Sequence, residues 1–445
     1  MSLPHLQRKI NLLQATSINM IDMVGIGPFI TIPIIIGFFN GPLFFWAWIL
    51  GAVIALLDGM IWSELGAKYP LAGGTYNFHR VAFGEKGGKL MSFLFVWQTC
   101  IQAPLVVASG SIGFAQYLHY LVPDQYYQKE LISVSVILLV TFLLYRRIEI
   151  IGKISVFLGA MVILTILWII FAGFTHKQVN YTFLPEGMDD FFKAAFWIAM
   201  GQASVKAVYS YLGYYNVCHL GGEIVKPEKN IPRSIFISII GIAILYLCMN
   251  LSIVYVIPWQ DAKKSDFIVS IFIEKIYGAQ AAKIATAMVL LAAFSSLFAL
   301  LLGYSRVPYA AAADGNFFRV FSRLHPTKNF PHISLLFIAA LAVLFAFSLS
   351  LKQTISAILA MRILVQFVAQ GIGVTLLRKK SGTAGLPFRM WLFPLPVILS
   401  ISSWIFLFVS TGWFALWGSL IAMVGVIVFF ISQRLKKENN QATKS

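Results

Sequence analysis

The sequence contains few charged residues and few cysteines. Only 11% of its 445 residues are charged, whereas a soluble domain carries about 25%, so the composition argues against a soluble fold. The three cysteines, Cys100, Cys218 and Cys248, all fall within apolar stretches. They form neither a disulfide framework nor a metal-ligand spacing, so we expect no metal site and no cofactor.

A signal peptide and the motifs of membrane-embedded enzymes are also missing. The first apolar stretch is longer than a signal peptide, carries Asp22 and is not followed by a small-residue cleavage site. The sequence has no His-Glu-x-x-His, Gly-x-Ser-x-Gly or Gly-x-Gly-Asp motif, so it offers no recognisable reaction constellation. We therefore do not expect an enzyme.

Apolar residues are abundant instead. They make up 59% of the chain, and the mean hydropathy is +0.81. A membrane-spanning helix takes about 20 residues, so the chain has room for a dozen spans with short loops. The sequence predicts an all-α polytopic membrane protein with twelve transmembrane helices, at residues 14–39, 42–66, 89–121, 130–146, 150–174, 191–221, 232–257, 279–306, 332–350, 353–378, 391–411 and 413–433.

The net charge of +17 can be understood from where the lysines and arginines lie relative to these spans. With the amino terminus in the cytoplasm, 24 of the 34 Lys and Arg fall on the cytoplasmic side and eight on the outer side. Because positive residues accumulate in cytoplasmic loops, this bias predicts cytoplasmic termini and a multi-pass protein of the plasma or inner cell membrane. It explains the basic charge better than a nucleic-acid partner does.

The first predicted span is interrupted at its middle. Gly25, Gly27 and Pro28 lie among apolar residues, although glycine and proline are the residues least suited to a helix interior. In lipid the freed backbone groups need partners, so a broken span is tolerated where it lines a cavity. The pattern indicates a site where the N–H groups of a half-helix hold the carboxylate of a small polar solute.

A second interruption lies in the sixth predicted span, where Gly213 sits among the aromatic and polar residues of 211–216. Two broken helices five spans apart are typical of inverted repeats, whose broken middles meet near the membrane midplane. The alternative is that Gly213 only permits close helix packing.

The predicted organisation is a cytoplasmic segment at 1–13, five-helix repeats at 14–174 and 191–378, two extra helices at 391–433, and a basic cytoplasmic tail at 434–445.

Five segments, in order along the chain, match the pattern of a known family. They are Gly25 to Phe29 in helix one, Glu64 to Tyr76 with Pro70, Gly73 and Gly74 after helix two, Glu223 to Arg233 with Pro227 and Pro232 after helix six, Ser305 to Pro331 after helix eight, and Pro387 to Pro396 before helix eleven. In these segments the chain resembles the amino acid–polyamine–organocation (APC) superfamily of permeases. The run from Arg147 to Gly152 and the pair Asp58 and Glu64 are similar to its light-chain and polyamine-uptake branches.

The resemblance implies a substrate site at the two helix breaks. Backbone N–H groups of the first break would bind an amino acid carboxylate, and carbonyls of the second would accept from its amine. An aromatic gate and pocket-lining side chains complete the implied site, although tyrosines in these places often only pack. The implied residues are Gly25, Ile26 and Gly27 for the carboxylate, Tyr211, Leu212 and Gly213 for the amine, Tyr209 for the gate, and Tyr214 and Tyr215 for the pocket.

Tyr215 departs from the pattern of related transporters of polyamines or arginine. Those proteins tend to place a carboxylate at the corresponding position, because desolvating an unpaired cation is expensive. A tyrosine there argues against a strongly cationic substrate. The substitution favours a neutral amino acid.

Charged residues within the predicted spans are candidates for coupling or for pairing. Lys206 and Arg362 could line an outer vestibule and attract an anionic group, which would favour an acidic substrate, or they could snorkel or pair with Asp22 or Asp58. Asp22 and Asp58 could instead carry a coupling proton, since desolvation favours their neutral forms. Glu223 is expected to tether helix six to the cytoplasmic loops.

A sodium ion is the alternative coupling partner, with Ser295 and Ser296 of helix eight supplying hydroxyl groups, although small serines in membrane helices often only pack. The sequence thus predicts a secondary active transporter that moves amino acids across the lipid bilayer by alternating access. Neutral substrates are preferred, with proton-coupled symport or exchange. The alternatives are an acidic amino acid transporter, a polyamine or cationic amino acid transporter, and a channel or non-transporting amino acid receptor.

Overall fold

Helices form the described part of the protein. The computed structural model describes residues 6–39, 41–122, 128–179, 193–348, 358–383 and 385–442, with side chains described up to Arg434. Within these ranges the extended pairings are limited to two isolated bridges, one between Ile10 and Ile224 and one between Ala72 and Leu220. The prediction of an all-α protein is confirmed.

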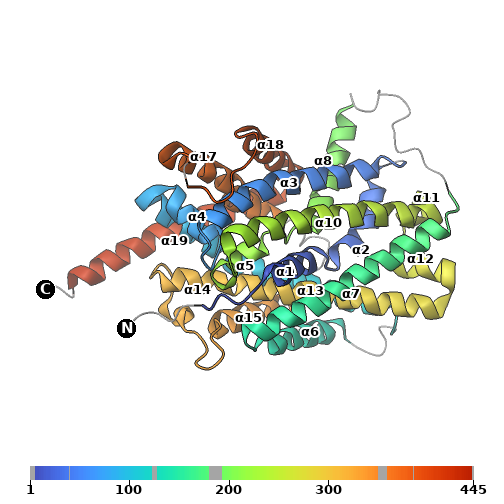
Figure 1. Cartoon of the computed structure of the whole chain (residues 1–445), viewed down its shortest axis with the longest axis horizontal. Coiled ribbons are helices and arrows are strands. Elements are labelled where there is room, and N and C mark those ends of the chain that lie inside the picture. The colour runs from blue at the N-terminus through green and yellow to red at the C-terminus, as the bar shows by residue number, and fades with distance from the viewer. Residues whose placement is uncertain are drawn as a thin grey trace.

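Most of the long helices run side by side along the long axis of the molecule (Figure 1). The chain approaches α1 and leaves α19 at the same end of this bundle. The helices are α1 (Leu12–Met23), α2 (Gly27–Gly37), α3 (Phe44–Lys68), α4 (Thr75–Ala82), α5 (Gly84–Leu118), α6 (Lys129–Leu144), α7 (Ile148–Thr175), α8 (Ala194–Tyr211), α9 (Asn216–His219), α10 (Pro227–Val256), α11 (Trp259–Ala262), α12 (Ile268–Tyr277), α13 (Ala279–Tyr304), α14 (Arg306–Ala313), α15 (His332–Ser348), α17 (Ala369–Ser381), α18 (Leu395–Ser410) and α19 (Phe414–Ala442).

Among the described residues, seven segments are long and apolar enough to cross a membrane, and the bent pair α1–α2 would add an eighth. The helices α6, α15 and α18 have 16, 17 and 16 residues, which is short for a span of about 20. The protein is therefore a multi-pass membrane protein, and the count of twelve spans stays a prediction. The seven segments are Phe44–Lys68, Gly84–Leu118, Ile148–Thr175, Pro227–Val256, Ala279–Ala313, Ile358–Ser381 and Phe414–Arg434.

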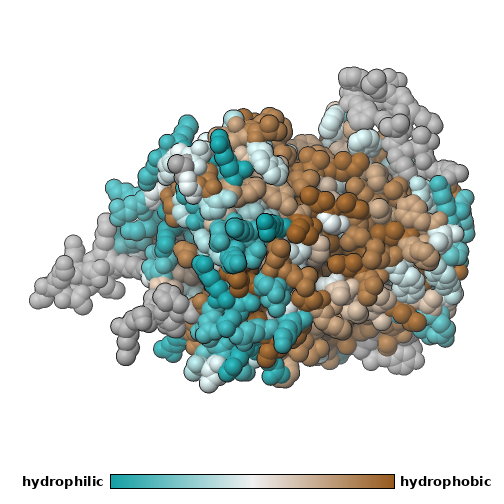
Figure 2. All heavy atoms as spheres, viewed as in Figure 1, coloured by the Kyte–Doolittle hydropathy of each residue, from teal (hydrophilic) through white to brown (hydrophobic). Residues whose placement is uncertain are grey.

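The surface agrees with a membrane environment. Figure 2 shows a broad apolar band across the middle of the visible face, with polar residues gathered toward both ends. Phe142, Phe157 and Phe171 are each more than half exposed, at 60%, 61% and 65%. Apolar patches of this extent are rare on soluble monomers, and lipid is the environment that accommodates them.

Several predicted helix boundaries differ from the structure. The helix α5 begins at Gly84 rather than at 89. The helix α10 begins at Pro227 rather than at 232, because a proline in the first helical turn has no hydrogen bond to lose. The short helices α4, α12 and α14 were not predicted, since they are well below the length of a span. Parts of predicted helices six, nine and ten and of both terminal segments lie outside the described residues.

The first predicted break is present between α1 and α2. A capping box fixes the start of α1, where the Asn11 side chain accepts from Gln14 N and the Gln14 side chain accepts from Asn11 N, both at 3.0 Å. The helix ends at Met23, and α2 restarts at Gly27 with a proline in its first turn. The two halves meet at an angle of 43°.

The second predicted break separates α8 from α9. Leu212 is extended, and Gly213 has a φ of +124°, a conformation that favours glycine. The helix α1 packs against α7, α10 and α13, and α8 packs against α2 and α3. Both breaks therefore lie inside the bundle, whereas the first turns of α8 are exposed, with Trp197 and Ile198 at its surface.

Candidate functional site

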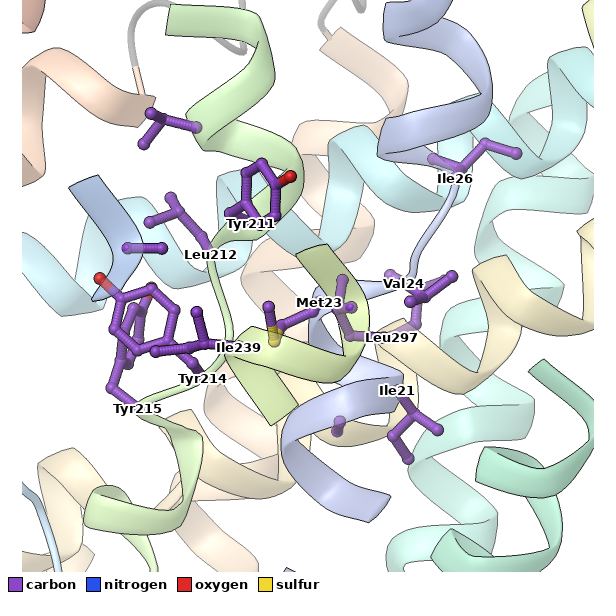
Figure 3. Packing of buried hydrophobic residues seen from close by; sticks show 14 of the residues in the cluster. Ile21, Met23, Val24, Ile26, Tyr211, Leu212, Tyr214, Tyr215, Ile239 and Leu297 are labelled. Atoms are coloured by element: carbon purple, nitrogen blue, oxygen red, sulfur yellow. The ribbon is translucent and has the colours of Figure 1, made fainter. Parts of the chain in front are cut away.

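The two breaks touch each other at Gly213. A Cβ atom added there would lie 2.7 Å from the backbone nitrogen of Met23 and 2.8 Å from the carbonyl carbon of Asp22. Gly213 thus combines a positive φ with a backbone contact, so close packing and helix interruption occur at the same residue. Figure 3 shows the two connections near each other, with Met23, Val24 and Ile26 on one and Tyr211 to Tyr215 on the other.

A small cavity of about 50 Å³ lies between the breaks, below the usual size range of small-molecule sites. Its wall is formed by both connections together with side chains of α5, α13 and the segment preceding α17. It brings together many of the residues that the sequence singled out. These are Asp22, Gly25, Ile26, Gly27, Tyr209, Leu212, Gly213, Tyr215, Ser296 and Arg362.

Unpaired backbone groups line this cavity on the side of the first break. Within the described ranges, the N–H groups of Gly25, Ile26 and Gly27 have no hydrogen-bond partner. They precede or open α2, where the helix dipole places a partial positive charge. Free N–H donors at a helix N-terminus are able to bind a carboxylate.

The second break contributes free carbonyl groups, but fewer than the resemblance implied. The carbonyl of Gly213 already accepts from Asn216 N at 2.9 Å, and that of Ser210 accepts from the Tyr246 hydroxyl at 3.1 Å. In the described structure the carbonyls of Tyr211 and Leu212 have no such partner. These two oxygens can accept hydrogen bonds from an ammonium group.

Two of the four singled-out tyrosines line the cavity. Tyr209 is half-buried and faces the first break, since a Cβ on Gly27 would lie 3.3 Å from its ring. Tyr215 stacks on Trp62 with ring centroids 4.6 Å apart. Both rings therefore lie in the cavity wall, and their roles as gate and pocket stay predictions.

The side chains of Tyr211 and Tyr214 lie outside the cavity wall, unlike the expectation for Tyr214. Tyr211 packs against Trp48 and Tyr246, with ring centroids 6.1 Å and 5.3 Å away. The hydroxyl of Tyr214 donates to Asp58 at 2.6 Å. A buried hydroxyl group needs a hydrogen-bond acceptor, and the acceptor of Tyr214 lies outside the cavity.

Asp22 is a cavity-lining acid that is 7% exposed. Its carboxyl group accepts from the side-chain amide of Asn216 at 2.8 Å, and its carbonyl accepts from the Ser296 hydroxyl at 3.3 Å. Asn216 lies on α9 and Ser296 on α13. The acid is thus held by both of these helices at the end of α1.

Arg362 is a cavity-lining cation that is 4% exposed. Its guanidinium group lies over the rings of Tyr215 and Tyr304, at 5.1 and 5.6 Å, and its Nε donates to Gln366 at 2.9 Å. Its Nη2 is buried with no hydrogen-bond partner among the described residues. Neither Asp22 nor an acid elsewhere in the described chain forms a salt bridge with it.

Asp58 lies away from the cavity and is fully buried. It accepts from Tyr214 and from the indole N–H groups of Trp62, at 2.8 Å, and Trp404, at 3.2 Å. The Ser400 hydroxyl is 3.5 Å away. The expected pairing of Asp58 with Lys206 or Arg362 is wrong, because neutral donors surround this carboxyl group.

Glu223 has the position expected of a tether. Both of its carboxylate oxygens accept from Arg306 at 2.9 Å, and both side chains are almost fully buried. Its carbonyl accepts from the backbone of Lys9 and Ile10 at 2.9 Å. It therefore connects the end of the α8–α9 segment with α14 and with the chain before α1.

Two further candidates lie outside the cavity wall. Lys206 is half-buried on α8, one to two turns before the break. The Ser295 hydroxyl donates to its own helix, at 2.7 Å from the carbonyl of Leu291. Of the two serines suggested for sodium, Ser296 is the one beside the first break.

Asn216 and Gln366 contact the cavity-lining residues Asp22 and Arg362, although neither was among the predicted site residues. Asn216 was visible as the polar residue that ends the second interrupted segment, and Gln366 as an amide one helical turn after Arg362. A π-helical segment, Ile363–Val368, contains Gln366, and such segments are frequent at functional sites. Nothing in the sequence signals that segment.

The comparison with known proteins decides the family. A family model described as "Amino acid permease" matches residues 10–432. The chain belongs to this amino acid permease family. It is therefore a member of the APC superfamily and a transporter rather than an enzyme.

Individual relatives are distant but cover much of the permease. It is 23% identical over 424 residues to the branched-chain amino acid permease BcaP of Bacillus subtilis, covering 90% of this chain and 88% of the relative. It is 24% identical over 418 residues to the serine/threonine exchanger SteT of the same organism, covering 91% of each. It is 25% identical over 395 residues to the human cationic amino acid transporter 4, covering 84% of this chain and 61% of the relative.

Proposed function

We propose that the permease moves amino acids by alternating access between two inverted five-helix repeats, residues 14–174 and 191–378. The helices α18 and α19 complete a set of twelve spans. The support is the pair of broken helices, five predicted spans apart, which meet at Gly213 in the interior of the bundle. The bounds of the repeats are those expected from the sequence.

The cavity between the breaks is the substrate site of this proposal. The substrate carboxylate binds the free N–H groups of Gly25, Ile26 and Gly27, and its amine donates to the carbonyls of Tyr211 and Leu212. Tyr209 covers the bound amino acid on the side of the first break. The single observation that carries this assignment is that the unpaired N–H groups of Gly25 to Gly27 and the unpaired carbonyl of Leu212 belong to residues that line one cavity.

Neutral amino acids are the proposed substrates. Arg362 lines the cavity next to Tyr215 and is buried, so a cationic side chain entering this space would meet a like charge away from bulk solvent. The branched-chain permease and the serine/threonine exchanger among the relatives also have names that refer to neutral amino acids.

Acidic amino acids are the second candidate substrates, and one observation favours them. The Nη2 group of Arg362 has an unused donor in the described structure, and a guanidinium group binds a carboxylate with two parallel hydrogen bonds. A side-chain carboxylate of the substrate would supply the missing acceptor.

Proton coupling through Asp22 is the proposed energy source. Asp22 lines the cavity and contacts both Asn216 and the helix that carries Ser296, so its protonation state can affect both breaks. Asp58 is a less suitable carrier because it lies outside the cavity with several donors already bound. Sodium held by Ser296 and the carbonyl of Asp22, or uncoupled exchange, is the alternative.

The proposed location is the plasma or inner cell membrane, with both termini in the cytoplasm. The excess of Lys and Arg in the loops on that side supports this orientation. An even number of spans also agrees with the approach to α1 and the end of α19 at one end of the bundle (Figure 1).

Uptake by reconstituted vesicles tests the proposal. Vesicles containing the purified permease should accumulate labelled neutral amino acids and should exchange them for unlabelled ones inside. A panel of neutral, acidic and cationic competitors then identifies the substrate class. Binding without flux would indicate a receptor, and flux that does not saturate would indicate a channel.

A further inference from the structure

The last part of the chain has an unusual charge distribution. Between Asp314 and Glu438 the sequence contains twelve lysines and arginines and no acidic residue. The basic residues in the middle of this stretch therefore have no acidic residue close to them in sequence. A cluster of them surrounds the end of α17 and its connection to α18, which lie at the edge of the bundle in Figure 1. The cluster consists of Arg378, Lys379, Lys380 and Arg389.

A groove lies beside this connection. One wall comes from the last two turns of α17, including Thr375 and Lys379, and the other from the connection, including Arg389, Trp391 and Phe393. The groove is separate from the central cavity, with which it shares no lining residue. We call it the α17–α18 groove.

The α17–α18 groove carries uncompensated positive charge. Arg378 at its wall is paired with Glu64, to which its Nε donates at 2.7 Å, and its guanidinium group lies 4.1 Å from the ring centroid of Phe393. Lys379 and Arg389 are exposed, and within the described part of the chain neither forms a salt bridge. Two cations therefore remain for an anionic ligand.

Exposed apolar side chains lie next to these cations. Trp391 is 59% exposed and Leu392 77% exposed. Trp391 stacks on Phe236 of α10 with ring centroids 5.6 Å apart. Leu392 has a φ of +53°, which is unfavourable for a bulky residue and is found at sites where the surroundings impose it. The connection thus presents a tryptophan and a leucine outward beside two free cations.

We propose that the α17–α18 groove binds an anionic glycerophospholipid. The phosphate of its headgroup lies between Lys379 and Arg389, and its acyl chains run along Trp391 and Leu392. Tryptophan is enriched at the membrane–water interface, and the cytoplasmic leaflet is the one rich in anionic lipid. A soluble anion would use the cations alone and would leave the two exposed apolar side chains in water.

A bound lipid at this place would strengthen a contact between distant helices. Glu64, at the end of α3, accepts from Arg378 of α17 and, at 2.8 Å, from the backbone nitrogen of Met390. Both Arg378 and Met390 also line the groove. Lipid binding therefore holds α3, α17 and the connection together, and it should raise the thermal stability of the permease.

Thermal unfolding of the full-length permease in a neutral detergent tests this inference. We expect phosphatidylglycerol to raise the unfolding temperature in a saturable manner and phosphatidylcholine to raise it less. In the variant Lys379→Gln/Arg389→Gln the apparent affinity for phosphatidylglycerol should fall about tenfold or more, since each cation near a membrane surface contributes about 1 kcal/mol. Native mass spectrometry should show the same loss of bound lipid.

A matched variant controls for the general loss of charge. Lys86 and Lys229 are exposed cations outside the groove, and Lys86→Gln/Lys229→Gln removes the same charge of two. An equal loss of lipid affinity in both double variants would overturn the proposed site. Inorganic phosphate and glycerol 3-phosphate serve as soluble anions for comparison. If they stabilise the permease as much as phosphatidylglycerol does, the lipid assignment is wrong.

The assignment rests on the proposed orientation of the permease, but its test requires no transport. Trp391→Ala should weaken binding of phosphatidylglycerol and leave binding of glycerol 3-phosphate unchanged. Unaltered lipid affinity in that variant would contradict the proposed path of the acyl chains. A permease that binds lipid in this way yet fails to take up amino acids would refute the proposed transport function alone.

Discussion

The side-chain amide of Asn216 donates a hydrogen bond of 2.8 Å to the carboxyl group of Asp22 and a second, also 2.8 Å, to the carbonyl of Ala299. Asp22 lies one residue before the end of α1, and Asn216 opens α9. The two helix breaks are thereby connected through one amide, with α13 as the third participant. Any change in the charge of Asp22 acts on both broken helices.

Asp22→Asn should flatten the pH dependence of uptake and spare exchange. If Asp22 carries the coupling proton, net uptake by the wild type falls as the outer pH rises and protons become scarce. The asparagine side chain cannot release a proton, so this dependence should disappear. Uptake and counterflow exchange, measured in vesicles over a range of outer pH, check the prediction.

Asp58→Asn is the matched control for Asp22→Asn. Asp58 accepts from Tyr214, Trp62 and Trp404, and an amide can accept fewer of these bonds. This variant should therefore unfold at a lower temperature while its uptake keeps the pH profile of the wild type. If stable Asp22→Asn protein keeps the pH profile of wild-type uptake, Asp22 is not the proton carrier, and sodium bound at Ser296 becomes the leading alternative.

Gly27→Val should abolish substrate binding without unfolding the permease. A Cβ at this position would lie 3.3 Å from the ring of Tyr209, and the added methyl groups would extend into the space proposed for the substrate carboxylate. Competition binding with neutral amino acids, together with thermal unfolding, checks the prediction. Wild-type affinity in a folded variant would remove the first break from the substrate site.

Gly213→Ala should destabilise the fold itself. The added methyl group would overlap the backbone of Asp22 and Met23, and the residue would have to keep a φ of +124°. Gly37→Ala is the control, because a Cβ there has no atom within 4 Å. We expect a lower unfolding temperature and lost uptake for Gly213→Ala, with neither change for Gly37→Ala.

The helix breaks were predictable because their signal is local. Gly25, Gly27, Pro28 and Gly213 lie near the middle of apolar spans, and their positions indicated where the two helices are interrupted. The partners of Asp58 were not predictable in this way. They come from α3, the α8–α9 break and α18, and only the packing of these elements brings them together.

The orientation of the tyrosine side chains at the second break could not be predicted from the sequence either. Tyr214 and Tyr215 are neighbours in the turn between α8 and α9, and their side chains take different directions. Tyr215 lines the cavity, and Tyr214 reaches Asp58. The choice depends on which side holds an acceptor for the hydroxyl group, and no pattern within residues 211–216 reveals it.

Arg362→Gln should relax the exclusion of cationic amino acids. The guanidinium group lies in the cavity wall near Tyr215, and its removal abolishes the repulsion that a lysine or arginine side chain would meet. Competition by arginine for uptake should increase, whereas competition by neutral amino acids should change little. Arg362→Lys, which keeps the charge, should still exclude cationic substrates.

The same variants decide between neutral and acidic substrates. If the permease prefers acidic amino acids, Arg362→Gln should strongly reduce competition by glutamate and aspartate, because a buried carboxylate would lose its cation. Loss of competition by neutral amino acids alone would contradict both assignments of Arg362 to the side-chain pocket.

Glu223→Gln should destabilise the permease more than the removal of an exposed ion pair. The carboxylate of Glu223 and the guanidinium group of Arg306 are almost fully buried and joined by two hydrogen bonds of 2.9 Å. Removing one charge leaves the other buried without a counter-ion, which costs about 3–5 kcal/mol. Glu149→Gln breaks the half-exposed pair with Lys9 at 3.4 Å and should cost less than about 1 kcal/mol. Thermal unfolding of both variants measures the difference.

The double variant Glu223→Met/Arg306→Met should recover part of the lost stability, since it leaves no unpaired charge. Equal effects of Glu223→Gln and Glu149→Gln would show that the buried pair does not act as a tether.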